Sequence, residues 1–250
     1  RWQHRQQLSE ELREALRKDR LMLYLQPQVN SDSRTCFGAE LLLRWRRDNG
    51  DWVPPPLIVE LIEEYGWRAQ FTSWLVRAAM HQAAALDTEG IGISLSLNLT
   101  AGDLLDTDLP EIVGQCLESW RLPAERFTLE LTETALMRDR ERGLEVMTRL
   151  RAMGVRLALD DFGTGFSSLS YLATLPLNEI KIDRSFVVGM FSSVDNLRIV
   201  RTIIDLTHDL GMKSLAEGVE DIMQRDQLFA LGCTQIQGYL YAKPMPMAEF

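Results

Sequence analysis

Residues 153–163 read Met-Gly-Val-Arg-Leu-Ala-Leu-Asp-Asp-Phe-Gly, and this stretch contains the repeating unit that decides the fold. The apolar run Val155–Leu159 has the length and composition of a buried strand. Gly154 stands just before it, where a helix commonly ends, and Arg140–Met153 has the length and pattern of a helix. Two acids, Asp160 and Asp161, follow the run. The stretch therefore predicts a helix, a short turn, and a buried strand that ends in carboxylates.

The same unit recurs along most of the chain after Gly90. Short apolar runs typical of strands lie at Ile91–Leu97, Phe127–Leu131, Val155–Leu159, Glu179–Ile182 and Lys213–Ala216. Helix-length stretches lie at Leu109–Trp120, Arg140–Met153, Asn196–Leu210 and Asp221–Leu231. Strands that alternate with helices predict a parallel sheet. So many units in one domain favour a closed β/α barrel over an open sheet.

The first 90 residues have a different pattern. Leu8–Arg17 predicts an amphipathic helix, which either leads into the domain or is a linker from an upstream domain. Two strands are expected at Leu21–Gln26 and Phe37–Trp45, around a turn at Asn30–Arg34. Two helices are expected next, one from Pro54–Pro56 to Glu64 with Gly66 as its stop, and a longer one to about Leu86. We therefore divide the chain into a helical segment, residues 1–20, and a barrel domain, residues 21–250.

Composition excludes several classes of function. The formal net charge of −9 argues against a protein that grips duplex nucleic acid through a basic face. Three widely spaced cysteines and three scattered histidines predict no disulfide framework and argue against a histidine-based zinc site. No apolar run approaches the roughly 18–20 residues that span a bilayer. We expect a cytoplasmic domain that makes no membrane contact of its own, within a longer protein that could be membrane-anchored.

Polar side chains end nearly every expected strand, and one acid, Glu40, interrupts the second strand. The strand-end residues are Asn98, Glu130, Asp160, Asp161, Lys181, Glu217 and Gln237. In a β/α barrel such ends meet on one rim, where barrel enzymes carry their chemistry. The five carboxylates would repel one another there, and divalent cations relieve such repulsion. Oxygen ligands suit Mg²⁺ or Mn²⁺, and one or two such ions about 4 Å apart commonly serve phosphodiester hydrolysis. Lys181 is placed to orient a water molecule or to help deprotonate it.

A simpler explanation applies to any single acid in this set. An acid at a strand end is more often a helix N-cap or a solvated charge, and we expect Asp183, before Arg184-Ser185-Phe186, to be such a cap. Polar residues at six successive strand ends are not explained in that way. The set as a whole therefore predicts a metal site.

Ordered motifs cover nearly the whole chain, from about Leu21 to Pro246. They are Gly38-Ala-Glu-Leu-Leu-Leu-Arg-Trp45, Ser96-Leu-Asn-Leu-Thr100, Glu130-Leu-Thr-Glu133, Leu159-Asp-Asp-Phe-Gly-Thr-Gly-Phe-Ser-Ser168, Ile180-Lys-Ile-Asp183, Ala216-Glu-Gly-Val-Glu220 and Gln237-Gly-Tyr239. This series resembles the EAL family of cyclic di-GMP-specific phosphodiesterases. The resemblance implies a TIM-like (β/α)8 barrel in which one strand runs antiparallel. It also implies metal-dependent hydrolysis of the second messenger cyclic di-GMP to linear pGpG.

The resemblance also implies a role for each matching residue. The first metal's ligands would be Glu40, Asn98, Glu130 and a bridging Asp160, and the second metal's would be Asp161 and Glu217. Lys181 would orient or activate the nucleophilic water, with Gln237 supporting that water network; we count Lys181, Glu217, Glu40 and Gln237 as catalytic. The substrate contacts would be Arg44 to phosphate, Glu220 to a guanine, and Gln26. Two ions, Mg²⁺ or Mn²⁺, are expected.

A separate loop element and a set of partners follow from the same resemblance. The loop from Asp161 to Ser168 would join metal binding to dimer contact, with Glu133 as its anchor. Its marked positions are Gly163, Thr164, Gly165 and Ser167. We expect a homodimer and fusion to upstream sensory or GGDEF-type domains.

The chain departs from the family pattern in two places. Leu41 replaces the alanine of the signature, and since neighbouring side chains on a strand alternate, it should point away from the metal. Pro54–Pro56, with Leu57 in place of the usual phenylalanine, changes the helix on the substrate side.

Two rival functions remain for these residues. A catalytically silent EAL domain would act as a cyclic di-GMP receptor, but such a domain is expected to lose metal ligands or the lysine, and all are present here. A glycoside hydrolase on the same barrel would need only two carboxylates. That reading leaves Asn98, Lys181, Asp160 and Asp161 without a role.

Overall fold

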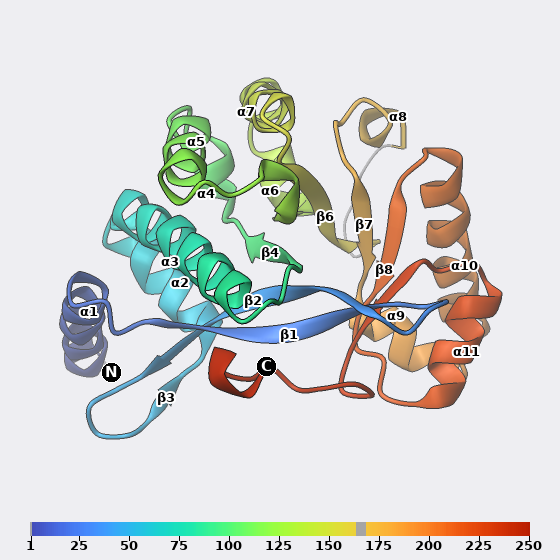
Figure 1. The fold of residues 1–250 in the computed structure, drawn as a ribbon, viewed down its shortest axis with the longest axis horizontal. Coiled ribbons are helices and arrows are strands. Elements are labelled where there is room, and N and C mark those ends of the chain that lie inside the picture. Colours follow the sequence, from blue (N-terminus) through green and yellow to red (C-terminus); the bar gives the residue numbers. More distant parts are fainter. Residues whose placement is uncertain (1, 164–168) are drawn as a thin grey trace.

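The computed structural model describes residues 2–163 and 169–250, and within them a barrel of mostly parallel strands surrounded by helices (Figure 1). The barrel strands are β1 (Met22–Asn30), β2 (Cys36–Arg46), β4 (Ser94–Asn98), β5 (Phe127–Thr132), β6 (Arg156–Phe162), β7 (Glu179–Ile182), β8 (Lys213–Ala216) and β9 (Gln235–Gln237). A short strand, β3 (Trp52–Val53), pairs with the end of β2 outside the barrel. The predicted closed barrel is confirmed.

The strand order closes the barrel through its first strand. The order is β1-β9-β8-β7-β6-β5-β4-β2, and a further pairing of β1 with β2 completes the circle. All neighbouring pairs are parallel except those that β1 makes with β2 and β9, which are antiparallel. The one antiparallel strand implied by the family resemblance is therefore β1.

Helices cover the outside of the barrel and follow the strands along the chain (Figure 1). The longer ones are α1 (Trp2–Arg17), α2 (Pro55–Glu64), α3 (Arg68–Thr88), α5 (Leu109–Trp120), α7 (Arg140–Ala152), α10 (Val194–Asp209) and α11 (Ile222–Ala230). The shorter ones are α4 (Ala101–Leu104), α6 (Glu133–Met137), α8 (Leu169–Leu172), α9 (Arg184–Gly189) and the 3₁₀ turns Ala124–Arg126 and Met247–Glu249. None of the helices within the described ranges is long and apolar enough to cross a membrane.

Local signals in the sequence explain where these helices begin and end. Pro55 stands in the first turn of α2, where a missing N–H costs nothing, and Gly66 beyond its end has a φ of 71°. Asp221 and Gln224 form a capping box at the start of α11. The side chain of Asp183 accepts a hydrogen bond from the Ser185 N–H, so Asp183 is the N-cap of α9, as expected.

The sequence prediction missed some boundaries and most of the short helices, and among these only the start of α9 was expected, from its cap Asp183. The first strand continues beyond the expected end at Gln26, through Pro27 to Asn30, and has an irregular register between Gln28 and Val29. The helices α4, α6, α8 and α9 are only four to six residues long, too short for an apolar period to show. The first helix begins at Trp2 rather than Leu8.

Helix α1 packs against the barrel's outer layer. Leu12 is fully buried, and Arg5 forms ion pairs with Glu60 and Glu64 of α2. The division into residues 1–20 and 21–250 stays a prediction.

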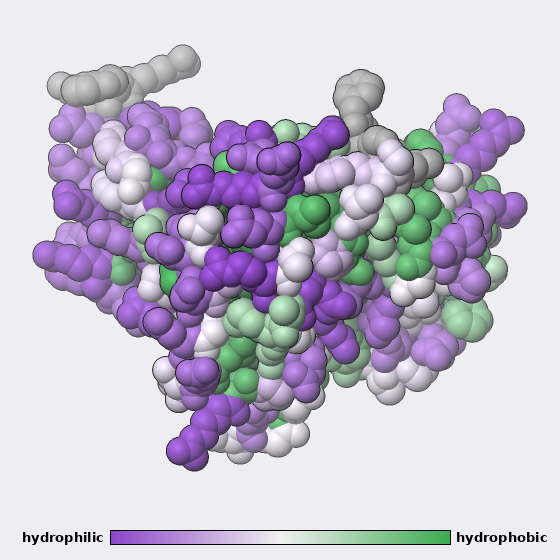
Figure 2. Space-filling view, turned by 90° about the horizontal axis from the view of Figure 1, so that it is seen from above, coloured by the Kyte–Doolittle hydropathy of each residue, from purple (hydrophilic) through white to green (hydrophobic). Residues whose placement is uncertain are grey.

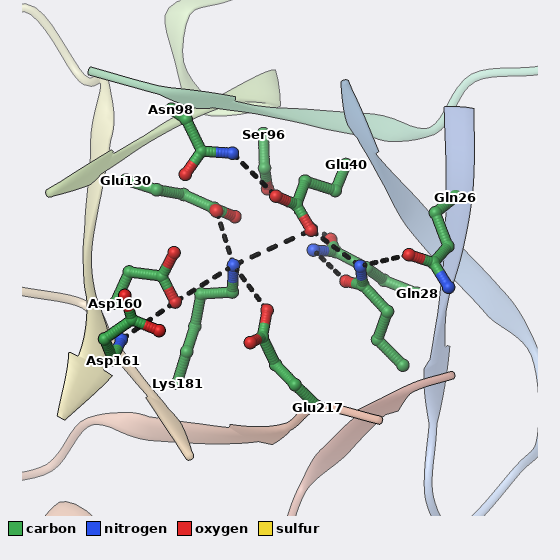
Figure 3. Close-up of polar contacts among 11 residues, drawn as sticks. Gln26, Gln28, Glu40, Ser96, Asn98, Glu130, Asp160, Asp161, Lys181 and Glu217 are labelled. Atoms are coloured by element: carbon green, nitrogen blue, oxygen red, sulfur yellow. Dashed lines mark hydrogen bonds and ion pairs between the residues drawn. The ribbon is translucent and has the colours of Figure 1, made fainter. Parts of the chain in front are cut away.

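Side chains alternate between two environments along each barrel strand. On β2, Ala39 and Leu41 are buried in the hydrophobic cluster between barrel and helices, whereas Glu40 between them points into the barrel, toward Lys181 (Figure 3). Leu41 is 2% exposed, which agrees with a packing role for this departure from the family pattern. Seen from the side of α5, α7 and α8, the outer surface is mostly hydrophilic, with apolar patches between (Figure 2). The charged side chains of the strands therefore point into the barrel lumen, and the layer between the strands and the helices is hydrophobic.

One buried carboxylate, Glu179, lies at the opposite end of the barrel from the strand ends. It begins β7, is 9% exposed, and lines a cavity of about 310 Å³ together with Arg156 and Lys213. Burial raises the pKa of Glu179 to about 7, although Lys181, Lys213 and Arg156 act in the opposite direction. The fold therefore favours the neutral form of this group.

The stability that Glu179 contributes should decline with rising pH. Because its pKa in the fold exceeds the ordinary 4.5, the contribution is complete below pH 4.5 and is lost as pH rises through 7. Glu179→Gln should raise the free energy of unfolding at pH 8 by roughly 1–3 kcal/mol over the native chain, with little gain at pH 5. Urea unfolding at both pH values measures this, with Glu10→Gln on α1 as control. An equal effect at both pH values would contradict it.

Candidate active site

A fully buried lysine lies at the centre of the polar rim (Figure 3). The Lys181 Nζ, on β7, is 2.5 Å from Glu130 Oε2 and 2.7 Å from Glu217 Oε1. It is also 3.3 Å from Asp160 Oδ1 and 3.7 Å from Glu40 Oε2. These carboxylates come from β2, β5, β6 and the residue after β8. The structure therefore brings together side chains that are up to 177 positions apart, counted from Glu40 to Glu217.

Barrel geometry explains why these residues converge. Asn98 lies opposite Glu130 on the neighbouring strand, and Asp160 lies opposite Thr132, two residues beyond Glu130. The inward side chains of neighbouring strands therefore lie level with one another or two residues apart. Apolar neighbours such as Leu129 and Leu131 are buried on the opposite side of β5. Strand alternation and register together place one polar group per strand in the lumen.

Amide side chains fix the orientation of Glu40. Asn98 Nδ2 donates to Glu40 Oε1 at 2.6 Å, and Gln237 Nε2 donates to Glu40 Oε2 at 2.6 Å. Gln237 Nε2 also donates to Gln26 Oε1 at 3.1 Å. Both oxygens of this buried carboxylate are therefore hydrogen-bonded.

Two further polar residues join this network, and the sequence analysis did not select them. Gln28 Nε2 donates to Gln237 Oε1 at 3.0 Å, and Ser96 Oγ donates to Gln28 Oε1 at 3.5 Å. Gln28 lies two residues after Gln26 and Ser96 two residues before Asn98, so the strand period of two could have indicated both.

Burial and mutual charge set the protonation of the cluster. Burial raises the pKa of Glu130 well above its usual value, more than the adjacent Lys181 lowers it. Burial also raises the pKa of Glu217 to about 8. For Glu40, the Lys181 charge and the amide hydrogen bonds outweigh burial and hold its pKa below the ordinary range. For Lys181 itself, burial would lower the pKa, but the four carboxylates raise it well above its usual value, so the lysine is a cation.

Three of the predicted ligands form a group that fits a metal ion. Asp160, Asp161 and Glu217 each present a carboxylate oxygen, and these oxygens lie within 4.8 Å of one another. Asp161 has a φ of 55°, a left-handed backbone conformation that is uncommon for a residue other than glycine. Burial, Asp160 and Asp183 raise the pKa of Asp161.

Glu130 supports the same conclusion from the other side of the cluster. Its Oε1 is buried and has no hydrogen-bond partner among the described residues. An acceptor left in this way is costly unless a ligand satisfies it. The residues present therefore fit a hard divalent cation with oxygen ligands.

Two cavities flank the carboxylates, and the predicted substrate residues divide between them. The first, about 270 Å³, is lined by Gln26, Glu40, Leu42, Asp160, Arg184, Glu217, Gly218, Glu220, Gln237, Gly238 and Tyr239. The second, about 620 Å³, is lined by residues of β2, α2 and α3 with Asn98 and Thr132, and includes Arg44. Arg44 lies over the Tyr24 ring and donates to the Leu43 carbonyl. A larger groove of about 690 Å³, between α1, β1 and α3, is lined by none of the predicted site residues.

The loop element is only partly within the described ranges. Glu133 begins α6, is 4% exposed, and neither carboxylate oxygen has a hydrogen-bond partner among the described residues. Gly163 has a φ of 97°, as a strand-to-helix turn can require. Thr164, Gly165 and Ser167 lie outside the described residues.

Comparisons with known proteins agree on one family. The family model described as "EAL domain" matches residues 9–244. MucR of Pseudomonas aeruginosa, named a bifunctional diguanylate cyclase/cyclic di-GMP phosphodiesterase, is 37% identical over 248 residues, which are 99% of this chain and 36% of MucR. NbdA of the same organism, named a cyclic di-GMP phosphodiesterase, is 37% identical over 97% of this chain and 31% of its own length.

A solved structure supports the same conclusion. The structure described as "PaMucR Phosphodiesterase, c-di-GMP complex" superposes with a TM-score of 0.92 at 36% identity, covering 97% of this chain and 99% of that one. The chain spans about a third of the length of the curated relatives it matches.

Removing the central cation should destabilise the fold in a pH-dependent way. Lys181→Met leaves four crowded carboxylates without their counter-charge, so in EDTA at pH 8 the free energy of unfolding should fall by about 3–5 kcal/mol. The loss should shrink at pH 6, because carboxylates of raised pKa, such as Glu217, take up protons there.

Urea unfolding of the native chain and the variant measures both effects. Lys18→Met, at an exposed position just after the end of α1 and paired with Glu14, is the matched control and should change stability little. A Lys181→Met variant as stable as the control at pH 8 would refute the assignment of Lys181 as the counter-charge.

Proposed function

The chain belongs to the EAL domain family, and we propose that it is a phosphodiesterase that opens cyclic di-GMP to linear pGpG. EAL phosphodiesterases depend on metal ions, and this chain contains a buried acidic cluster of the corresponding kind. The observation that carries the proposal is the Lys181 ammonium within 3.7 Å of four carboxylates, beside the Asp160–Asp161–Glu217 group.

The charge balance of the rim supports a metal-dependent reaction. Five carboxylates face one ammonium, an excess of negative charge that two divalent cations would cancel. Mg²⁺ or Mn²⁺ would be held by Glu40, Asn98, Glu130, Asp160, Asp161 and Glu217. When bound, such ions polarise a phosphoryl oxygen and lower the pKa of a coordinated water.

The protein's own residues then act around the scissile phosphate. The four neighbouring carboxylates hold the pKa of Lys181 well above its usual value, so the protonated lysine would donate a hydrogen bond that orients water. Asn98 and Gln237 hold Glu40 in one orientation through their 2.6 Å hydrogen bonds. Gln237 also links this carboxylate to Gln26, at the wall of the smaller cavity.

The two cavities suit a ligand with two bases on either side of a phosphodiester. Leu42 lines both cavities; the carboxylates Glu40, Asp160 and Glu217 line the smaller one, and the predicted ligand Asn98 lines the larger one. Arg44, in the larger cavity, would contact a phosphate, whereas Glu220 and Gln26, in the smaller one, would contact a guanine nucleotide. A substrate with this charge can approach a chain of net charge −9 because the bound cations reverse the local field.

We also propose that further domains and a second copy of the chain accompany this domain. The curated relatives are about three times as long as this chain, and MucR is named for a cyclase as well as a phosphodiesterase. We expect a homodimer, fused to sensory or GGDEF-type domains, working in the cytoplasm. Glu133 would anchor the loop from Asp161 to Ser168 and so connect dimer contact to metal binding.

The decisive measurement is incubation of the purified chain with cyclic di-GMP and Mg²⁺ or Mn²⁺, with and without EDTA, followed by chromatography. We expect pGpG only when metal is available. Glu40→Ala and Lys181→Ala should each lower the rate at least about 100-fold, because each removes charge from the reacting centre. The matched surface variants Glu10→Ala and Lys18→Ala should retain activity.

Other outcomes separate the rival functions. Binding of cyclic di-GMP without any product would support a receptor and refute hydrolysis. Hydrolysis at an unchanged rate in EDTA would refute the requirement for a metal ion. If the chain neither binds nor cleaves cyclic di-GMP, the proposal that cyclic di-GMP is its substrate is refuted.

Glu133 allows a test of the loop. Glu133→Ala should weaken activity by about 10- to 100-fold, raise the metal concentration needed for half-maximal rate, or reduce dimerisation, since it removes an anchor and not a ligand. Metal titration of the rate and analytical ultracentrifugation measure these effects. A variant with native activity and assembly would rule the anchor role out.

A further inference from the structure

An ion pair lies in the smaller cavity, away from the lysine. Arg184 Nη2 donates to Glu220 Oε1 at 2.6 Å, and both side chains line the cavity that reaches Glu40, Asp160 and Glu217. The pair is solvent-accessible, with 61% and 43% of the two side chains exposed. An exposed pair of this kind contributes little to stability, so stability does not explain its place in this cavity.

A glycine makes room for the arginine. Gly218 has a φ of 67°, and a Cβ on it would lie 2.1 Å from Arg184 Cγ and 2.7 Å from Arg184 Cδ. Any larger residue would therefore push the arginine stem away from its present course. Gly218, directly after Glu217, thus leaves room for the Arg184 side chain to pass over it and reach Glu220.

The other member of the pair is held from its backbone. The Glu220 N–H donates to Gln224 Oε1 at 2.7 Å, within the capping box of α11. The preceding residue, Val219, exchanges backbone hydrogen bonds with Gln237 and Leu240 at 3.1 and 3.0 Å. Gly238 allows this close approach, because a Cβ there would lie 2.1 Å from the Val219 carbonyl oxygen. Glu220 is therefore fixed at one end by the segment that carries Gln237.

The ion pair uses only one nitrogen and one oxygen. The guanidinium keeps further N–H donors and the carboxylate keeps a second oxygen, on two side chains that both line the cavity and are partly exposed. This side-by-side arrangement of a donor and an acceptor matches the edge of guanine. Guanine presents the O6 and N7 acceptors next to its N1–H and N2–H₂ donors.

We infer that Arg184 and Glu220 act together to select guanine, with Arg184 donating to O6 and N7 while Glu220 accepts from N1–H and N2–H₂. The inference rests on the proposed function and adds Arg184 as a specificity-determining residue. Adenine presents an amino group where guanine has O6, and an acceptor where guanine has N1–H. It would therefore place donor against donor at Arg184 and acceptor against acceptor at Glu220.

The test compares two cyclic dinucleotides that differ only in their bases, cyclic di-GMP and cyclic di-AMP. Variants Arg184→Gln and Arg184→Lys are measured beside the native chain and Arg198→Gln, an exposed arginine of α10 that pairs with Asp195. Calorimetry in EDTA gives Kd for both ligands without turnover, and initial rates with metal give kcat and KM. Thermal unfolding checks that the variants are folded.

Arg184→Gln should weaken cyclic di-GMP binding and raise its KM by about 10- to 100-fold, with kcat within about threefold of the native value. Its preference for cyclic di-GMP over cyclic di-AMP should fall by a similar factor. Arg184→Lys should recover only part of the loss, since it restores the charge but not the planar fork. Arg198→Gln should match the native chain.

The outcomes distinguish this inference from the function on which it rests. Suppose that the native chain binds or cleaves cyclic di-GMP, and that Arg184→Gln keeps both the affinity and the base preference. The role of the Arg184–Glu220 pair in guanine selection is then refuted, and the proposed phosphodiesterase function is unaffected. If the native chain binds without cleaving, hydrolysis is refuted while the Kd values still decide the role of Arg184. If the native chain binds neither dinucleotide in EDTA and cleaves neither with metal, both proposals fail.

Discussion

A buried ammonium needs compensating charge, and this requirement organises the centre of the molecule. Moving a lysine head group out of water costs several kcal/mol, which only close, well-placed partners recover. Lys181 meets the requirement with four carboxylates from four different strands or strand ends. Those carboxylates outnumber the ammonium, and burial, with their mutual repulsion added to it, raises the pKa values of Glu130 and Glu217. The barrel is thus built to hold an excess of negative charge in a dry place, which is what a site for divalent cations requires.

The hydrophobic layer between the strands and the helices offsets the free-energy cost of burying these charges. Along each strand, the residues between the lumen positions belong to a hydrophobic cluster that continues through the helices, as Ala39 and Leu41 do on either side of Glu40. The amide network adds specificity, because Asn98 and Gln237 leave Glu40 only one hydrogen-bonded orientation. A single strand period therefore supplies both the core that stabilises the fold and the charges that the chemistry needs.

Much of this could be predicted because the signals were local. Apolar runs that end in Asp160, Lys181 or Glu217 identified the strands and the rim, and the barrel then implied that these residues meet. The antiparallel direction of β1 came from the family resemblance, since a hairpin-like pattern at residues 21–45 does not say which later strand will close the circle. Pairing geometry was also beyond the sequence. Nothing local indicates that Arg184 crosses Gly218 to reach Glu220, because that contact depends on the relative placement of two loops.

The closing strand pair has a consequence for how the protein is made. Gln28 on β1 and Gln237 on β9 are 209 residues apart and are joined by a direct hydrogen bond. A ribosome must therefore release almost the whole domain before its first strand can find its last partner, and such long-range closure is slow. The same final strand delivers Gln237 to Glu40. A nascent or truncated chain that stops short of it would have neither a sealed barrel nor a complete rim, so the order of synthesis itself delays assembly of the site until the domain is whole.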